Sequence, residues 1–73
     1  MSSKPIFYHQ NGCGMCKAAE MMLAKKGIEY ESVTIDPDNV DGFIAKGIMG
    51  TPAIEVDGRI LLKKDAMDWI KGN

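Results

Sequence analysis

Two cysteines separated by two residues are the side chains of this sequence best suited to chemistry. The segment reads Gly12-Cys13-Gly14-Met15-Cys16, and the chain contains no third cysteine. A disulfide between such close neighbours closes a very short loop, so it removes little entropy from the unfolded chain and is a poor structural crosslink. In a reducing compartment, a close pair of cysteines is more often catalytic or metal-binding. The spacing therefore indicates a functional pair.

Cys13 and Cys16 are predicted to lie at the junction between a strand and a helix. The free N–H groups and the positive dipole end of a helix N-terminus favour an anion, so they would lower the pKa of Cys13 below the value of about 8.5 of a free cysteine. Cys16 falls one turn later, on the face that turns inward, where it is better shielded. We therefore predict that Cys13 is the nucleophile that attacks a disulfide and that Cys16 is the resolving thiol.

Two other interpretations of the cysteine pair are open at this stage. The thiols could be reduced residues without a role, although glycine-flanked thiols at a loop–helix junction are poorly placed for core packing. They could instead bind a metal, but a structural zinc site needs four protein ligands, and the chain offers Cys13, Cys16 and His9 besides its carboxylates. We therefore predict no metal site within one chain. We interpret His9 as locally hydrogen-bonded or solvated rather than as a proton donor.

Charged side chains and methionines lie within and after the cysteine pair. Lys17 would add positive charge near the thiols and Glu20 would oppose it, if either faced the site. Met15 lies inside the motif and is expected to be exposed, where it can touch partners. The other methionines at helical spacing are expected to be core filler, namely Met21, Met22 and Met67.

The elements that position the pair follow from hydrophobic periodicity and turn residues. We predict strands over residues 4–9 and 30–35, and a helix over 14–26 that Gly27 ends. A short helix is expected after the turn at residues 36–39, ending at Gly47, and a final helix is expected with Asp65 as its cap. Residues 53–56 and 59–62 flank Asp57-Gly58, which predicts a two-residue hairpin. The order β-α-β-α-β-β-α demands a mixed sheet covered by helices.

Length and composition limit the number of domains and the classes of function that this chain can have. The chain has 73 residues, so we expect one domain over residues 1–73. Its net charge of −1 gives no excess of basic residues, so nucleic-acid binding is not indicated. No apolar run approaches the ~20 residues of a membrane span, and residues 1–5 lack the apolar region of a secretory signal. We expect a monomeric cytoplasmic protein.

Two separated motifs resemble the thioredoxin-fold superfamily. The first, residues 7–16, is most similar to glutaredoxins and to the small redoxins that supply electrons to ribonucleotide reductase. Residues 27–31 are similar to their second strand, and residues 50–58, which begin Gly50-Thr51-Pro52, are similar to their Thr-Pro segment before a hairpin. The resemblance covers nearly the whole chain. It implies an α/β, minimal thioredoxin-like fold with a mixed four-stranded sheet.

The resemblance also implies a function and further site residues. It implies a thiol–disulfide oxidoreductase that reduces protein or small-molecule disulfides and holds no bound cofactor, with glutathione or a thioredoxin-reductase-type flavoenzyme as its electron source. It implies a cis peptide bond at Pro52, facing the cysteines, with the backbone of Thr51 free to pair with an extended substrate. Gly14 and Met15 would complete the substrate-binding surface.

The sequence departs from the family pattern at two places. Glutaredoxins usually carry a Gly-Gly pair and then a Ser/Cys/Thr-Asp pair before the last helix, where the carboxylate of glutathione binds, whereas residues 61–65 here read Leu-Leu-Lys-Lys-Asp. The dipeptide between the cysteines matches neither glutaredoxin nor thioredoxin. Both electron sources therefore stay open. Two rival functions are an iron–sulfur or metal carrier that uses Cys13 from two chains, and a module that binds peptides in a Thr51-Pro52 groove.

Overall fold

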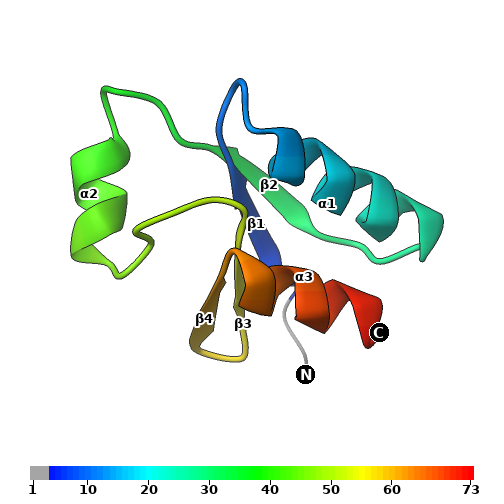
Figure 1. Cartoon of the computed structure of the whole chain (residues 1–73). Coiled ribbons are helices and arrows are strands. Elements are labelled where there is room, and N and C mark those ends of the chain that lie inside the picture. The colour runs from blue at the N-terminus through cyan, green and yellow to red at the C-terminus, as the bar shows by residue number, and fades with distance from the viewer. Residues whose placement is uncertain (1–3) are drawn as a thin grey trace.

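A four-stranded mixed sheet organises the structure, a computed structural model that describes residues 4–73 (Figure 1). Strand β1 pairs in parallel with β2 and antiparallel with β3, and β3 pairs antiparallel with β4, which gives the order β2-β1-β3-β4. The elements are β1 (Ile6–His9), α1 (Gly14–Lys25), β2 (Glu31–Thr34), α2 (Val40–Ala45), β3 (Ala53–Val56), β4 (Arg59–Leu62) and α3 (Lys64–Lys71). Their order is the predicted one.

Helices cover both faces of this sheet. Successive side chains of a strand point to opposite faces, so Phe7 and Tyr8 of β1 belong to different hydrophobic clusters. Helices α1 and α3 bury their apolar faces with Phe7, whereas residues of α2 pack around Tyr8. The Tyr8 hydroxyl donates a hydrogen bond of 2.8 Å to Glu55 Oε1. Burial, and then this bond, raises the pKa of Tyr8 to about 12.

Helix α1 begins where it was predicted and ends one residue earlier, at Lys25, because its apolar side chains recur at helical spacing. Cys16, Ala19 and Leu23 are buried on one face. Gly27 follows with φ +67, the left-handed conformation that ends a helix. The prediction that Met21 fills the core was wrong, because Met21 lies on the outward face and is 72% exposed. Its neighbour Met22 does pack against the core.

The hairpin between β3 and β4 has the predicted turn. Asp57 has φ +51 and Gly58 has φ +76, so both central residues take the positive φ that a type I′ turn requires. Val56 pairs with Arg59 across the turn, and the register continues to Ala53 opposite Leu62. The Asp-Gly signal therefore placed two strands and their register.

The start of α3 corrects a second prediction. The helix begins at Lys64, and Lys63 precedes it with φ +49 and no side-chain cap. Asp65 lies inside the first turn and is not the cap. The reason lies in tertiary structure, because the Lys63 N–H donates to the carbonyl of Pro52 at 2.7 Å and thereby sets where the chain turns.

The remaining differences are small. Strand β2 is one residue shorter at each end than predicted. In the turn before α2, the Asp36 carboxylate accepts hydrogen bonds from the N–H groups of Asp38 and Asn39. Within residues 4–73, no helix is long and apolar enough to cross a membrane. Residues 1–3, on which the interpretation of the N-terminal segment partly depends, lie outside the described residues.

Candidate active site

Cys13 and Cys16 occupy the first turn of α1, as the spacing predicted. Cys13 is the N-cap residue with φ −89 and ψ 106, and its Sγ accepts a hydrogen bond of 3.2 Å from the backbone N–H of Cys16. Both thiols are free; Cys13 is half-buried, whereas Cys16 is 3% exposed. The outer sulfur therefore sits at the positive end of the helix, and the inner sulfur lies against the core.

The surroundings of Cys13 favour its thiolate. Partial burial alone would raise the pKa of the Cys13 thiol. Hydrogen bonds from the Cys16 thiol, the Thr51 hydroxyl and the backbone N–H groups of Cys16 and Met15 outweigh burial and lower the pKa below its ordinary value. A thiolate is the attacking form of cysteine, so Cys13 has the properties of a nucleophile.

The surroundings of Cys16 favour its protonated form. Burial is the largest cause that raises the pKa of the Cys16 thiol, and its hydrogen bond to Cys13 raises it further. Hydrogen bonds that involve the Gln10 backbone and Thr51 oppose this only in part. The two thiols therefore ionise in order, Cys13 before Cys16, and while one is a thiolate the other can donate to it.

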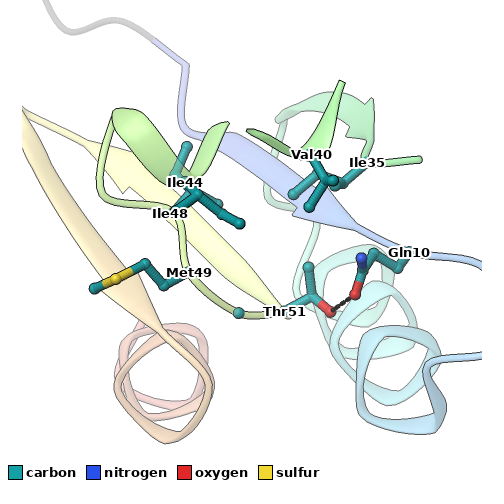
Figure 2. Close-up of a pocket in the computed structure, with 8 residues that line it drawn as sticks. Gln10, Ile35, Val40, Ile44, Ile48, Met49 and Thr51 are labelled. Atoms are coloured by element: carbon teal, nitrogen blue, oxygen red, sulfur yellow. Dashed lines mark hydrogen bonds between the residues drawn. The ribbon is translucent and has the colours of Figure 1, made fainter. Parts of the chain in front are cut away.

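The segment before β3 lies opposite Cys13. The Thr51 hydroxyl is 3.0 Å from Gln10 Oε1 (Figure 2) and 3.7 Å from Cys13 Sγ, so one hydroxyl proton has two acceptors. Pro52 is buried, and the Thr51–Pro52 peptide bond is cis. Residues 38 positions apart thus meet at one sulfur. No pattern in the sequence marks Gln10 as part of the site, because its contact with Thr51 joins residues 41 positions apart.

An apolar pocket adjoins Thr51 and Gln10. Figure 2 shows the aliphatic side chains of Ile35, which follows β2, and of Val40 and Ile44 on α2, above Thr51 and Gln10 in this view. The pocket has a volume of about 70 Å³, and a shallower hollow of about 450 Å³ beside it extends over Asp36 and Pro37. The pocket is lined by Gln10, Ile35, Val40, Ile44, Ile48, Met49, Gly50 and Thr51. No pattern in the sequence had indicated this pocket.

Large apolar side chains are also exposed around the site. Met15 is 48% exposed, as predicted, and Met49, which follows α2, is 69% exposed. Gly14 is exposed, and a Cβ added to it would meet nothing within 4 Å. Exposed apolar side chains thus lie on the elements that form the site.

A polar cavity of about 180 Å³ also adjoins both cysteines. His9 lines it, and His9 Nε2 lies 2.7 Å from Ser32 Oγ, so the expectation of local hydrogen bonding by this histidine is confirmed. Lys17 and Glu20 line it too, which the sequence had left unsettled. Among residues 4–73, there is no group of three or more His, Cys, Asp or Glu side chains placed to hold a metal ion.

Comparisons with known proteins agree with this geometry. A family model described as Glutaredoxin matches residues 3–61. Two curated relatives are glutathione S-transferase 3 of Gallus gallus, 30% identical over 99% of this chain, and glutathione S-transferase alpha M14 of Sus scrofa, 31% identical over 92% of it. The matches cover 34% and 32% of those relatives, so the chain spans about a third of their length.

The fold has a close structural match. The crystal structure of a mutant of a thioredoxin-like protein superposes with a TM-score of 0.75, covering 93% of this chain and 96% of that one at 18% identity. The predicted fold class, a small thioredoxin-like α/β fold with a mixed four-stranded sheet and three helices, is thereby confirmed.

Proposed function

The chain belongs to the glutaredoxin family, and from this premise we propose that it reduces disulfides through Cys13 and Cys16. Membership of this family implies thiol–disulfide oxidoreductase chemistry. The observation that carries the proposal is that the two thiols of one helical turn differ in exposure and in pKa. Cys13 is the accessible sulfur with the lowered pKa, and Cys16 is the buried sulfur with the raised pKa.

The first step is attack by Cys13. Its thiolate attacks one sulfur of a substrate disulfide, the substrate S–S bond breaks, and the departing thiolate takes a proton from solvent. The product is a mixed disulfide between Cys13 and the substrate. The hydrogen bond from the Cys16 N–H and the helix dipole stabilise the thiolate before attack.

The second step is resolution by Cys16. Its thiol loses a proton and attacks Cys13 Sγ, the bond to the substrate breaks, and the second substrate thiol leaves. The two protein thiols have then given two electrons and two protons to the substrate disulfide. Cys16 is three residues along the same helical turn, so the new disulfide forms with little movement of the backbone.

We assign substrate contact to the surface around Cys13. Gly14 leaves space above the first turn, and Met15 offers an exposed apolar side chain. Thr51 borders the site from the opposite segment, next to the buried residue Pro52, and the aliphatic pocket adjoins Thr51. A flexible methionine adapts to different apolar surfaces. These features favour disulfide-containing protein substrates, with an extended segment pairing along Thr51.

Glutathione is the proposed electron source. Both curated relatives are named as glutathione S-transferases, and Lys63 and Lys64 stand at the N-terminus of α3. Their ammonium groups, together with the helix dipole, would attract the carboxylates of glutathione. The glycine pair of the family is absent, but Lys63 takes a positive φ that glycine would favour. A thioredoxin-reductase-type flavoenzyme is the competing source.

A coupled turnover assay tests the proposal. The reduced protein is supplied with a disulfide substrate and with either glutathione, glutathione reductase and NADPH, or thioredoxin reductase and NADPH. We expect NADPH consumption with the glutathione system. Turnover with thioredoxin reductase alone would overturn the assignment of glutathione, and turnover with neither system would contradict the reductase function.

Single substitutions separate the roles of the two sulfurs. Cys13→Ser is expected to abolish turnover and mixed-disulfide formation. Cys16→Ser is expected to accumulate a mixed disulfide that mass spectrometry detects as an added substrate mass. Met21→Gln, on the outward face of α1, is the control that keeps wild-type turnover. A Cys13→Ser protein that retains activity would show that Cys13 is not the nucleophile.

A further inference from the structure

The resolving step needs a proton acceptor that the two cysteines do not provide. Cys16 is 3% exposed, so bulk solvent has little access to its thiol. A buried thiol attacks only after it loses its proton. When Cys13 is held in a mixed disulfide, it no longer carries the negative charge that could accept this proton. Another group close to Cys16 must therefore take it.

The polar cavity beside the cysteines contains such groups. It is lined by side chains of β1, of the turn that follows and of α1, including His9, Cys16, Lys17 and Glu20. Its volume of about 180 Å³ exceeds that of a water molecule, which occupies about 30 Å³ in the liquid. A proton leaving Cys16 can therefore pass to a polar side chain through solvent in this cavity.

The ring of His9 is held in a defined orientation. It stacks on Phe7 with centroids 5.5 Å apart and an interplanar angle of 20°. Its Nε2 lies 2.7 Å from Ser32 Oγ and 3.5 Å from Thr34 Oγ1, both on β2. In the tautomer that donates from Nε2 to Ser32, Nδ1 carries a lone pair that can accept a proton.

We infer that His9 is the proton acceptor for Cys16 during resolution, with Ser32 as a positioning residue that sets the tautomer and the ring orientation. This inference rests on the proposed function, because it concerns the step in which Cys16 attacks the mixed disulfide. Imidazole suits the role because the best general bases titrate near the working pH. Phe7, which belongs to the core shared by α1 and α3, stacks on this ring.

Charged side chains also line the cavity. Lys17 and Glu20 are the charged side chains of α1 that line it. Cys13, at the N-cap of α1, is the other titratable group there besides Cys16 and His9. Strand β2 contributes hydroxyls, and β3 and α3 contribute apolar side chains to the core around Cys16.

The transfer balances within the exchange reaction. The proton of Cys16 Sγ passes through solvent to His9 Nδ1, and the electron pair that remains on Sγ forms the bond to Cys13 Sγ. The bond between Cys13 and the substrate sulfur breaks, and the substrate leaves as a thiolate. The imidazolium then returns its proton to that thiolate through the same solvent, which restores neutral His9.

The reaction of the reduced protein with 5,5′-dithiobis(2-nitrobenzoate) tests this inference. Attack by Cys13 releases one thionitrobenzoate, and resolution by Cys16 releases a second, so stopped-flow absorbance follows the two steps separately. For His9→Asn near neutral pH, we expect the second phase to slow by about 100-fold, the scale of general-base catalysis. The first phase should stay within about twofold of the wild-type rate.

The pH profile distinguishes proton transfer from a structural effect. The deficit of His9→Asn should be greatest near neutral pH and shrink at alkaline pH, where hydroxide can deprotonate Cys16 directly. Ser32→Ala, an exposed position, should slow the second phase less than His9→Asn, with the same pH dependence. Met21→Gln is the control in which both phases stay at wild-type rates.

The outcomes separate this inference from the proposed function. A second phase of wild-type rate in both His9→Asn and Ser32→Ala, or one that is equally slow at every pH, would overturn the role of His9. Wild-type protein that releases only one thionitrobenzoate would instead show that Cys16 does not resolve, and the proposed function itself would fail.

Discussion

Cys13 and Cys16 carry the same side chain, and only their surroundings separate their acidities. The N-cap position gives Cys13 the N–H of Cys16, at 3.2 Å, and the adjacent Thr51 hydroxyl, at 3.7 Å. Cys16 loses solvent to the core and so keeps its proton. The nucleophile and the resolving thiol are thus distinguished by hydrogen bonds and burial, not by residue type.

The Thr51 hydroxyl provides a test of this account. Thr51→Val removes a donor to Cys13 Sγ, so the pKa of Cys13 should rise and its thiolate should appear only at higher pH. Because a lowered pKa keeps the thiolate present at lower pH, losing the donor should reduce alkylation of Cys13 by iodoacetamide several-fold near neutral pH. The measurement is the alkylation rate as a function of pH.

Thr51→Ser is the matched control for this test, because it keeps the hydroxyl and should keep the wild-type profile. The Thr51 proton also has Gln10 Oε1 as an acceptor at 3.0 Å. If the hydroxyl donates only to Gln10, Thr51→Val will alkylate like the wild type, and the contribution of Thr51 to the acidity of Cys13 would be disproved.

At the level of secondary structure, the junctions between elements decide the shape of the site. The turn from β4 into α3 passes through Lys63 with φ +49 and ψ −114, a backbone conformation that non-glycine residues rarely adopt. The Lys63 N–H is bonded to the Pro52 carbonyl, and its side chain lies over Gly50, where an added Cβ would be 2.7 Å from Lys63 Cε. The junction thus ties α3 to the segment that carries Thr51.

Relief of this backbone conformation should stabilise the protein. Lys63→Gly keeps the N–H that bonds to Pro52 and removes the Cβ that disfavours positive φ. We expect the free energy of unfolding to rise by about 1 kcal/mol, measured by urea denaturation. Lys64→Gly, at a helical position, is the matched control and should not stabilise. A Lys63→Gly protein less stable than the wild type would contradict the assignment of strain to this residue.

At the scale of the whole molecule, the core of this small domain contains few side chains. Each buried side chain therefore contributes a large part of the free energy of unfolding. Leu23 is fully buried between α1, the sheet and α3, whereas Met21, two residues earlier, is 72% exposed. The Lys26 ammonium also donates to the carbonyl of Lys71 at 2.7 Å, which joins the C-terminal ends of α1 and α3. Packing of α1 against α3 therefore supports the helix that carries both cysteines.

The contrast between these two α1 residues can be measured directly. Leu23→Ala should cost about 2–5 kcal/mol through lost burial and the cavity left behind, which lowers the melting temperature by roughly 4–8 °C for each kcal/mol in a domain of this size. Met21→Ala should change stability by no more than about 0.5 kcal/mol. Thermal unfolding followed by circular dichroism compares them, and equal losses would show that the two sides of α1 are not buried as the structure describes.

Sequence by itself determined the local features of this protein. The cysteine pair at the start of a helix, the order of the elements and the Asp57-Gly58 turn all follow from residues that are neighbours along the chain, because periodicity, N-cap position and positive φ are local properties. Where packing decided the outcome, the sequence was a poorer guide, as Met21 and the start of α3 at Lys64 show.

Tertiary structure alone decided what surrounds the two sulfurs. It brought Thr51 to Cys13 across 38 positions, placed the aliphatic pocket beside Thr51, and gathered His9, Lys17 and Glu20 around a cavity next to Cys16. The pKa of each thiol depends on its burial and on hydrogen bonds from segments that are distant in the sequence. Sheet order and helix packing set these contacts, and no local pattern of residues encodes them.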